Sequence, residues 1–271
     1  MNFSEIVLLT RSSYYYDIKE WIEYYIKLGF DHITIYDNES PVDIEKLTKQ
    51  YNNISYFKIA GYPDQLNLEL THYNQSKYNW VFFCDDDEFL WLSPKYKNVN
   101  DFITKKSEKL QCDNIAIYWA KIAGNPCPIE RADTPETTQI KTFLFTQFIE
   151  IDSWTKCFYK TGQKIEKMQC HYAFPLVNTK DVNNNLIDIK AIHKFDYNFM
   201  NDDAIIYHYY HKSWKEFYTK MNSRYAARPT NYKNEFPKCQ DIKNYFNYAR
   251  LLYNIGYCKN DNKIRQQLYE T

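Results

Sequence analysis

Glycine is scarce in this chain of 271 residues, which contains only five glycines. Even the closest pair, Gly29 and Gly61, is separated by 32 positions. The P-loop, the dinucleotide fingerprint and the kinase glycine loop all need closely spaced glycines, because backbone N–H groups must approach the phosphate. The sequence therefore excludes these three loops, and a phosphorylated ligand would have to be neutralised by some other group.

Net charge is also absent, since 34 Lys and Arg residues balance 34 Asp and Glu residues. A balanced chain lacks the basic footprint of a nucleic-acid-binding protein, so we expect no nucleic-acid partner.

Long apolar runs are missing too. No stretch approaches the roughly 20 apolar residues of a membrane span, and the N-terminal apolar run is too short for a signal peptide. We expect no transmembrane segment, and peripheral membrane contact stays open.

The seven cysteines form no C-x-x-C pair, and no two of them are closer than 13 positions. This spacing excludes the usual motifs of a zinc ribbon or a redox dithiol. An odd number of well separated cysteines predicts reduced thiols, and hence a cytoplasmic location. Nothing in the sequence indicates an oligomeric state.

The first half of the chain alternates short apolar runs with amphipathic stretches, which predict strands and helices respectively. We expect strands at residues 5–10, 32–36, 54–59, 80–84 and 114–120. We expect helices at residues 17–29, from residue 40, and at about 64–77 and 99–110. Alternation of strand and helix predicts an α/β fold with a doubly wound, mostly parallel sheet and right-handed crossovers.

Particular residues mark the ends of the first two helices. Asp17 and Glu20 can form a capping box, and Gly29 can end that helix. Ser40 and Pro41 can provide an N-cap and an N1 proline for the second helix. Farther on, the sequence predicts strands in "TFLFTQFIEI" and "AIHKF", a surface hairpin around "VNNNL", and two amphipathic helices in "SWKEFYTKMNSRYA" and "CQDIKNYFNYARLLYNIG".

Acidic residues directly follow two of the expected strands. Asp37 follows the strand at 32–36, and four acids, residues 85–88, follow the strand at 80–84. Ligands of doubly wound sheets bind beyond the carboxyl ends of the strands, so we expect these carboxylates at one rim of the sheet. Two other interpretations stay open: Asp37 can cap a turn, and the four acids can form a solvated loop. Aromatic residues resume at Phe89, which favours an inward position for the acids.

Carboxylate oxygens are suitable ligands for a hard divalent cation. Such a cation could bridge the acids to a diphosphate, which is the task that the missing glycine loops would otherwise perform. The acidic run therefore suggests a metal-bound nucleoside diphosphate.

The same run carries a resemblance to a known family. Asp85-Asp86-Asp87 fits the D-x-D motif of GT-A glycosyltransferases, and "DDDEFL" resembles the D-x-D-E-F segment of glycosyltransferase family 92 and related family 2 like glycosyltransferases. The string "RSSYYYDIKEWIEYYIKLGFDHITIYDNES" is similar to the N-terminal segment of that family, with Ser12-Ser13 in place of Asn-Glu. Later landmarks follow in the expected order up to about residue 229: "IYWAKIAGNP", "KCFYK", "CHYAFP" and "AIIYHYYHKSWKEFYTKMNSRYAARP".

The resemblance implies a GT-A type fold with a C-terminal helical extension, in a single glycosyltransferase domain over residues 1–271. Residues 1–120 would be the nucleotide-sugar-binding half, 121–230 the acceptor and metal-completing half, and 231–271 the extension. The implied activity is an inverting, metal-dependent and hexosyltransferase-like transfer in glycan biosynthesis. Its donor would be a nucleotide sugar, with UDP favoured, and its acceptor a glycan or another hydroxyl compound.

The resemblance also implies a metal site for Mn²⁺ or Mg²⁺. Asp87 would be the principal metal ligand, and Asp85 would contact the metal or the ribose of the donor. Asp86 would point away. His208 would complete the metal shell, with His211 as a rival for that role.

For the donor, the resemblance places Arg11 beside the base, Asp37 at the uracil or ribose, and Lys212 at the diphosphate. An inverting reaction needs a carboxylate that takes the proton of the acceptor hydroxyl. The candidates for this base are Glu130 and Asp133, with Asp152 and Asp202 behind them.

Two other functions stay open. A catalytically silent protein on the same fold could bind a sugar or a divalent cation. A nucleotidyltransferase that makes nucleotide sugars also uses a metal and a parallel sheet, but it usually relies on a glycine-rich N-terminal loop, which this chain lacks. The donor sugar and the linkage depend on a few pocket contacts that the sequence does not label.

Overall fold

The chain forms two compact units in the computed structural model. Unit 1 comprises Met1–Trp119 and Ile151–Tyr207, and unit 2 comprises Ala120–Glu150 and His208–Thr271. The structure describes residues 2–61, 63–123, 130–143, 145–147, 154–168, 171–175, 178–187, 203–209, 212–213, 215–216, 258–260 and 267.

The sheet of unit 1 is built on four parallel strands in the order β3, β2, β1 and β4. These strands are β1 (Ser4–Thr10), β2 (His32–Asp37), β3 (Ile54–Lys58) and β4 (Trp80–Phe83), close to the predicted ranges. Thr10 pairs with Asp37, and Val7 pairs with Phe83. The carboxyl ends of β1, β2 and β4 therefore open at one edge of the sheet.

The sheet becomes mixed beyond β4. Strand β8 (Thr155–Lys160) lies antiparallel between β4 and β6 (Asn114–Ala123). Strand β11 (Thr179–Asp181) pairs in parallel with β6, and β12 (Ala204–His208) pairs with β5 (Glu88–Leu92) and β6. The α/β class with a mostly parallel central sheet is as predicted. Strand β8 is an antiparallel member of this mostly parallel sheet.

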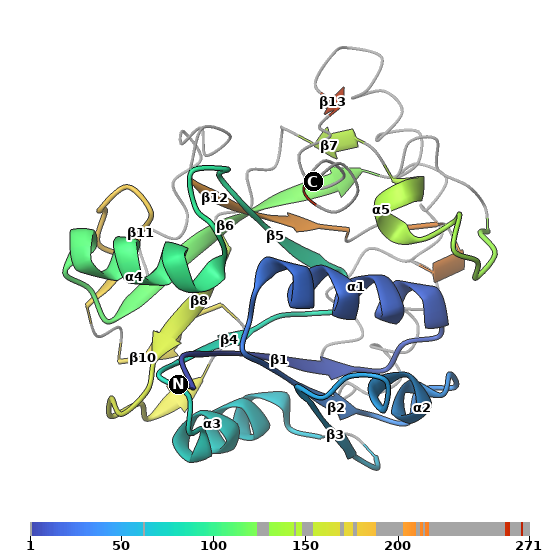
Figure 1. Cartoon of the computed structure of the whole chain (residues 1–271), viewed down its shortest axis with the longest axis horizontal. Helices are drawn as coiled ribbons and strands as arrows, with labels where there is room; N and C mark the ends of the chain where they lie inside the picture. The colour runs from blue at the N-terminus through green and yellow to red at the C-terminus, as the bar shows by residue number, and fades with distance from the viewer. Residues whose placement is uncertain are drawn as a thin grey trace, which may run out of the picture. The chain divides into compact units, whose positions relative to one another are not determined.

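Helices cover both faces of this sheet. Helix α1 (Tyr15–Leu28) and helix α3 (Gln65–Gln75) lie on opposite sides of β1 (Figure 1). The described part of this unit also contains helices α2 (Ile44–Thr48) and α4 (Val99–Leu110). Because successive residues of a strand point to opposite faces, β4 supplies both layers of the core. Phe82 stacks on Phe158 with ring centroids 4.4 Å apart, while Val81 and Phe83 join the cluster beside Tyr73 of α3.

Smaller elements complete the described part of each unit. In unit 1, β9 (Lys167–Met168) and β10 (Ala173–Phe174) form an antiparallel pair. In unit 2, β7 (Phe145–Gln147) pairs with Ile122 and Ala123 at the end of β6 and with β13 (Cys258–Asn260), and α5 spans Gln139–Thr142.

Both predicted helix starts are wrong. Helix α1 begins at Tyr15, two residues before Asp17, and no side chain caps it. Helix α2 begins at Ile44 after the N-cap Asp43, whose carboxylate accepts a hydrogen bond from the Lys46 N–H at 2.9 Å. Ser40 is instead used in a loop contact, since its hydroxyl accepts the Ser12 N–H at 3.0 Å.

The predicted hairpin around "VNNNL" is confirmed. Asp181 accepts the N–H groups of Asn183 and Asn185 at 2.9 Å each, and Lys180 bridges antiparallel to Leu186. The predicted strand "AIHKF" and nearly all of the two predicted C-terminal helices lie outside the described residues.

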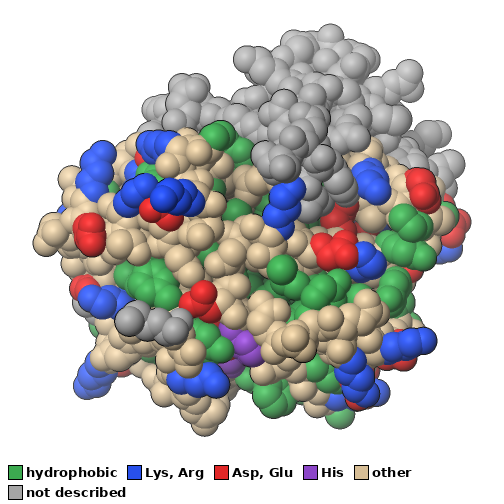
Figure 2. Space-filling model, in the orientation of Figure 1, with side chains coloured by type: hydrophobic (Ala, Val, Ile, Leu, Met, Phe, Trp, Pro, Cys, Tyr) green, Lys and Arg blue, Asp and Glu red, His purple; other side chains and the backbone are tan. Residues whose placement is uncertain are grey.

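Some surface and chain-wide features can also be described. Cys84, Cys112 and Cys157 are buried free thiols. Basic and acidic side chains are intermixed on the face drawn in Figure 2. In the part of the chain that is described, no helix has both the length and the apolar composition needed to cross a membrane.

Gly29 ends α1 in the left-handed region, with φ +92°, and stands against Asn98 at the start of α4. A Cβ at this position would lie 2.9 Å from the Asn98 Cβ. Gly29→Ala should therefore lower the free energy of unfolding by more than the ~1–2 kcal/mol that left-handed strain alone costs. Gly162 is the matched control, because it has φ +83° and no atom near its virtual Cβ. If urea titrations gave equal losses of unfolding free energy for Gly29→Ala and Gly162→Ala, the predicted clash with Asn98 would be contradicted.

Asp203 makes a stabilising contact that depends on pH. Its carboxylate bonds to Lys95, to Lys106 at 2.5 Å and to Tyr96 at 3.0 Å. Burial raises the pKa of Asp203, but hydrogen bonds from the two lysines and Tyr96 outweigh it and bring the pKa to about 2.

Because this folded-state pKa lies below the unfolded value, the contribution to stability is complete above about pH 4 and disappears as the pH falls towards 2. Asp203→Asn should cost up to about 2 kcal/mol of unfolding free energy at pH 7. Chemical denaturation of both proteins at several pH values would measure this cost. A difference from the wild type that stays constant down to pH 2 would contradict the assignment.

Candidate functional site

The four predicted acids form a tight turn between β4 and β5, which we call the acidic turn (residues 85–88). The Glu88 N–H donates to the Asp85 carbonyl at 3.2 Å, which closes the turn and places Asp86 and Asp87 at its tip. The Asp87 residue is 3% exposed and Glu88 is fully buried. The alternative of a solvated loop is therefore wrong, and the burial of Phe89 and Leu90 explains why the turn is drawn inward.

Helix α1 holds the acidic turn from one face of the sheet. Trp21, Tyr24 and Tyr25 are all buried on the same side of the helix. The indole N–H of Trp21 donates to the Asp85 carbonyl at 3.0 Å, and the Tyr25 hydroxyl donates to the Glu88 carbonyl at 3.1 Å. The Tyr24 hydroxyl donates to the Leu90 carbonyl at 2.7 Å. This aromatic stripe thus satisfies backbone acceptors along the turn and β5.

A buried lysine approaches the turn from the sheet. Lys156 of β8 has a side chain that is only 2% exposed, and its ammonium lies 3.2 Å from Asp85 Oδ2 and 3.5 Å from Glu88 Oε2. Glu88 Oε2 also accepts the Asp85 N–H at 2.9 Å. Asp85, with a side chain 37% exposed, is the member of this cluster that reaches the surface.

Burial and charge shift the titration of this cluster. Burial raises the pKa of Glu88 to about 8, and it raises the pKa of Glu69 on α3 to about 7, although Lys156 lowers both. Burial by itself would lower the pKa of Lys156. The charges of Asp85, Glu88 and Glu69 outweigh that effect and raise the Lys156 pKa well above its usual range. Lys156 is therefore a fixed cation at neutral pH.

Asp86 and Asp37 lie near the end of β1. Asp86 Oδ2 accepts a hydrogen bond from the Thr10 hydroxyl at 2.6 Å, and Thr10 is the sheet partner of Asp37. Asp37 is buried, and its two carboxylate oxygens accept bonds from the Ser40 N–H at 2.9 Å and the Tyr56 hydroxyl at 2.8 Å. Asp37 thus caps a turn, as the alternative interpretation held. Arg11 directly follows β1 and is exposed.

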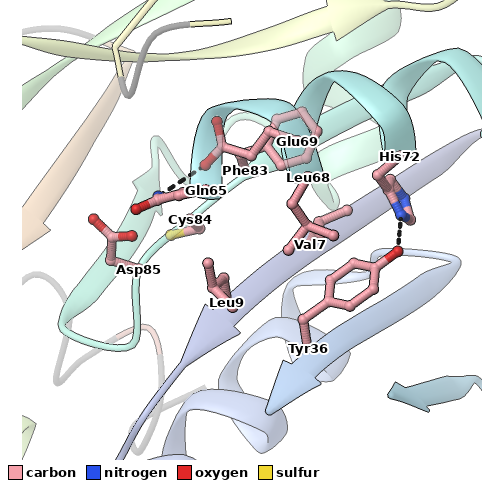
Figure 3. A pocket seen from close by; sticks show the side chains of 10 residues that line it. All are labelled: Val7, Leu9, Tyr36, Gln65, Leu68, Glu69, His72, Phe83, Cys84 and Asp85. Atoms are coloured by element: carbon pink, nitrogen blue, oxygen red, sulfur yellow. Dashed lines mark hydrogen bonds between the residues drawn. The ribbon is translucent and has the colours of Figure 1, made fainter. Parts of the chain in front are cut away.

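A pocket opens at this edge of the sheet, under α3 (Figure 3). It contains about 260 Å³ of space, part of it open to solvent. Glu69 accepts a bond from the Gln65 amide at 2.8 Å, and the Tyr36 hydroxyl is 2.8 Å from His72 Nδ1. The pocket is lined by Val7, Leu9, Tyr36, Gln65, Leu68, Glu69, His72, Phe83, Cys84 and Asp85.

Four of the predicted residues, Glu130, Asp133, His208 and Lys212, belong to unit 2. His208 is buried at the end of β12, and Lys212 is half-buried. Glu130 forms an ion pair with Lys215 at 2.5 Å, with both side chains 60% exposed, and Asp133 is exposed. The rival residues Asp152, Asp202 and His211 lie outside the described residues.

Within the described ranges, no three His, Cys, Asp or Glu side chains are grouped closely enough to hold a metal ion by themselves. The sequence reasoning also missed Lys156, Trp21 and Glu69 as parts of the site. Lys156 and Trp21 did lie inside quoted strings, "KCFYK" and "RSSYYYDIKEWIEYYIKLGFDHITIYDNES". No spacing rule, however, linked either residue to an acid more than 60 positions away.

In a comparison with protein families, the model of glycosyltransferase family 92 matches residues 11–239. A search of the curated proteins finds no match. Among solved structures, the chain is similar to a 4-diphosphocytidyl-2C-methyl-D-erythritol synthase from Anaerococcus prevotii, with 11% identity, coverage of 59% of this chain and 71% of that one, and a TM-score of 0.32.

Two further solved structures are similar to the chain. One is HddC from Yersinia pseudotuberculosis, at 10% identity over 44% of this chain and 63% of that chain, with a TM-score of 0.30. The other is described as a glucose-1-phosphate thymidylyltransferase from Bacillus anthracis, at 6% identity over 58% and 71% of the two chains, with a TM-score of 0.33.

Proposed function

The chain belongs to glycosyltransferase family 92 and is therefore a glycosyltransferase, and from this premise we propose that it transfers a sugar from a nucleotide donor to a hydroxyl acceptor in a metal-dependent, inverting reaction. UDP is the favoured nucleotide, and the acceptor is a glycan or glycoconjugate. The observation that supports this proposal is the acidic turn. Its carboxylates stand at the carboxyl end of β4, which is where ligands of such sheets bind.

The residues of the acidic turn fit a hard divalent cation such as Mn²⁺ or Mg²⁺. Magnesium is usually held by one or two carboxylates together with substrate phosphates, and it does not need a cage made only of protein ligands. Asp85 and Asp87 would supply those carboxylates, and His208 of unit 2 is the candidate third ligand. When bound, the cation would offset the negative charge that develops on the departing diphosphate.

The remaining predicted residues have roles that follow from their charges. Arg11, exposed directly after β1, is a candidate contact for the base. Asp37 retains lone pairs beyond those that accept bonds from Ser40 and Tyr56, so it can still accept a bond from a ribose hydroxyl. Lys212 is a candidate for binding the diphosphate. Glu130 and Asp133 are the candidate bases that take the proton of the acceptor hydroxyl.

The test is a screen of UDP-sugars, followed by other nucleotide sugars, with Mn²⁺ and a panel of glycan acceptors. Release of the nucleoside diphosphate and the product glycan are both measured. We expect acceptor-dependent release from at least one donor, with the opposite anomeric configuration in the product. Retention of configuration would contradict the inverting mechanism. Binding of sugar or cation without release of nucleotide from any donor would instead support a catalytically silent binder.

A further inference from the structure

We propose that Lys156 is a positioning residue of the transfer reaction, whose buried ammonium holds the Asp85 carboxylate in the orientation that meets the donor or its cation. The inference rests on the proposed function, because it assumes that Asp85 contacts that ligand. Lys156 itself is too deeply buried to be assigned a contact with the donor.

The geometry places Lys156 behind Asp85. The ammonium touches one carboxylate oxygen, Asp85 Oδ2, at 3.2 Å, while the Asp85 side chain remains 37% exposed and lines the pocket. Figure 3 shows the Asp85 carboxylate at the rim of that pocket. A charge-assisted contact of this kind restricts the rotation of a carboxylate more strongly than a neutral hydrogen bond does. Asp85 is thus held by Lys156 at one carboxylate oxygen while its side chain stays partly exposed at the pocket.

The main chain of Asp85 is fixed separately. Its N–H donates to the Glu88 carboxylate at 2.9 Å, and its carbonyl accepts bonds from Trp21 at 3.0 Å and from the Glu88 N–H at 3.2 Å. With the backbone held on both sides, the orientation of the side chain depends on χ1 and χ2, which the contact with Lys156 restrains. Catalytic groups need such support to stay within about 0.5 Å of a productive position.

Energetics argue against a purely stabilising role for Lys156. Taking an ammonium out of water costs several kcal/mol, and replacing a buried ion pair with apolar residues is often neutral or stabilising. Lys156 also lies among Asp85, Glu88 and Glu69, and those of these carboxyls that ionise would repel one another without a cation. A fixed positive charge at this position reduces that repulsion before any ligand binds.

The chain offers a matched control in Lys106 of α4. Its side chain is 3% exposed, and its ammonium lies 2.5 Å from Asp203 and 2.8 Å from the Val182 carbonyl. The Asp203 carbonyl accepts the N–H of Ser93. Ser93 directly follows β5, at the end of that strand opposite the acidic turn. Lys106→Met therefore removes an equally buried ammonium without touching the proposed donor site.

The experiment compares Lys156→Met with Lys106→Met in the full chain, using the donor and acceptor found in the screen. For Lys156→Met we expect kcat/KM for the donor to fall by about 10–100-fold, the range usual for supporting partners of a bound ligand or metal. The KM for the acceptor should change less than about twofold. Lys106→Met should alter neither constant, although both variants should lower the melting temperature.

A second variant guards against loss of folding. Lys156→Met combined with Glu88→Gln removes the buried ammonium and the ionisable carboxyl beside it, and it keeps an oxygen acceptor for the Asp85 N–H. The double variant should therefore fold and should still lose kcat/KM for the donor. If wild type transfers sugar and the folded Lys156 variants match Lys106→Met in kcat/KM, the positioning role is wrong while the proposed function stands. If wild type transfers no sugar from any donor, the proposed function fails, and this inference fails with it.

Discussion

Asp87→Asn should reduce sugar transfer by about 10³-fold, the largest catalytic effect that we expect from one substitution in this chain. Asp87 is 3% exposed at the tip of the acidic turn, and its carboxylate is the proposed principal ligand of the cation. Asparagine keeps the size and one oxygen of the side chain but removes the negative charge. Initial rates at saturating donor and Mn²⁺ would measure the loss.

Asp86→Asn is the matched control for that substitution. Asp86 Oδ2 accepts a bond from the Thr10 hydroxyl at 2.6 Å, and an amide oxygen can accept the same bond. We expect this variant to keep its activity within about tenfold of the wild type. The assignment of Asp87 would be wrong if Asp86→Asn lost as much activity as Asp87→Asn, or if Asp87→Asn transferred sugar at the rate of the wild type.

Arg131→Met should have the largest effect on stability, about 3–5 kcal/mol, because it leaves a buried carboxylate without its ion-pair partner. The Arg131 and Glu216 side chains are 2% and 8% exposed, and they form a two-point contact at 2.8 and 2.6 Å. Arg131 also donates to the Thr137 carbonyl at 2.7 Å. Burial raises the pKa of Glu216, but the bond from Arg131 and nearby charges outweigh it and lower the pKa overall.

The control for this prediction is Lys215→Met, which breaks the exposed ion pair with Glu130. Both side chains there are 60% exposed, so the pair should contribute no more than about 1 kcal/mol. Urea unfolding followed by tryptophan fluorescence and by circular dichroism would measure both variants. Similar losses of unfolding free energy for Arg131→Met and Lys215→Met would contradict the prediction, because the buried pair would then stabilise the protein no more than the exposed pair does. Adding Glu216→Gln to Arg131→Met should recover part of the loss, because it removes the stranded charge.

The strands of the central sheet could be predicted from sequence because burial on both faces gives them continuous apolar runs. The runs "EIVLLT" and "WVFFC" correspond to β1 and β4 within one residue at each end. Strand β8 was missed because its sequence, "TKCFYK", contains two lysines. One of these is Lys156, whose burial depends on acids that no local pattern connects with it.

Local signals failed where a tertiary contact competed with them. Ser40 and Pro41 resemble a helix start, yet the Ser40 hydroxyl accepts the Ser12 N–H and the Ser40 N–H donates to Asp37. For the acidic turn, the sequence predicted the position after β4, and the aromatic residues that follow correctly indicated an inward location. The contacts of Lys156 and Trp21 with Asp85 join residues 71 and 64 positions apart, so only the folded chain reveals them.

The central claim is that the acidic turn binds a nucleotide through a divalent cation. Calorimetric titration of UDP into the wild type and into Asp87→Asn, each with and without Mn²⁺, tests this claim most directly. We expect UDP to bind the wild type only when Mn²⁺ is present, and we expect no binding to the variant under either condition. Binding of UDP that is equally strong without Mn²⁺, or undiminished in Asp87→Asn, would contradict the claim.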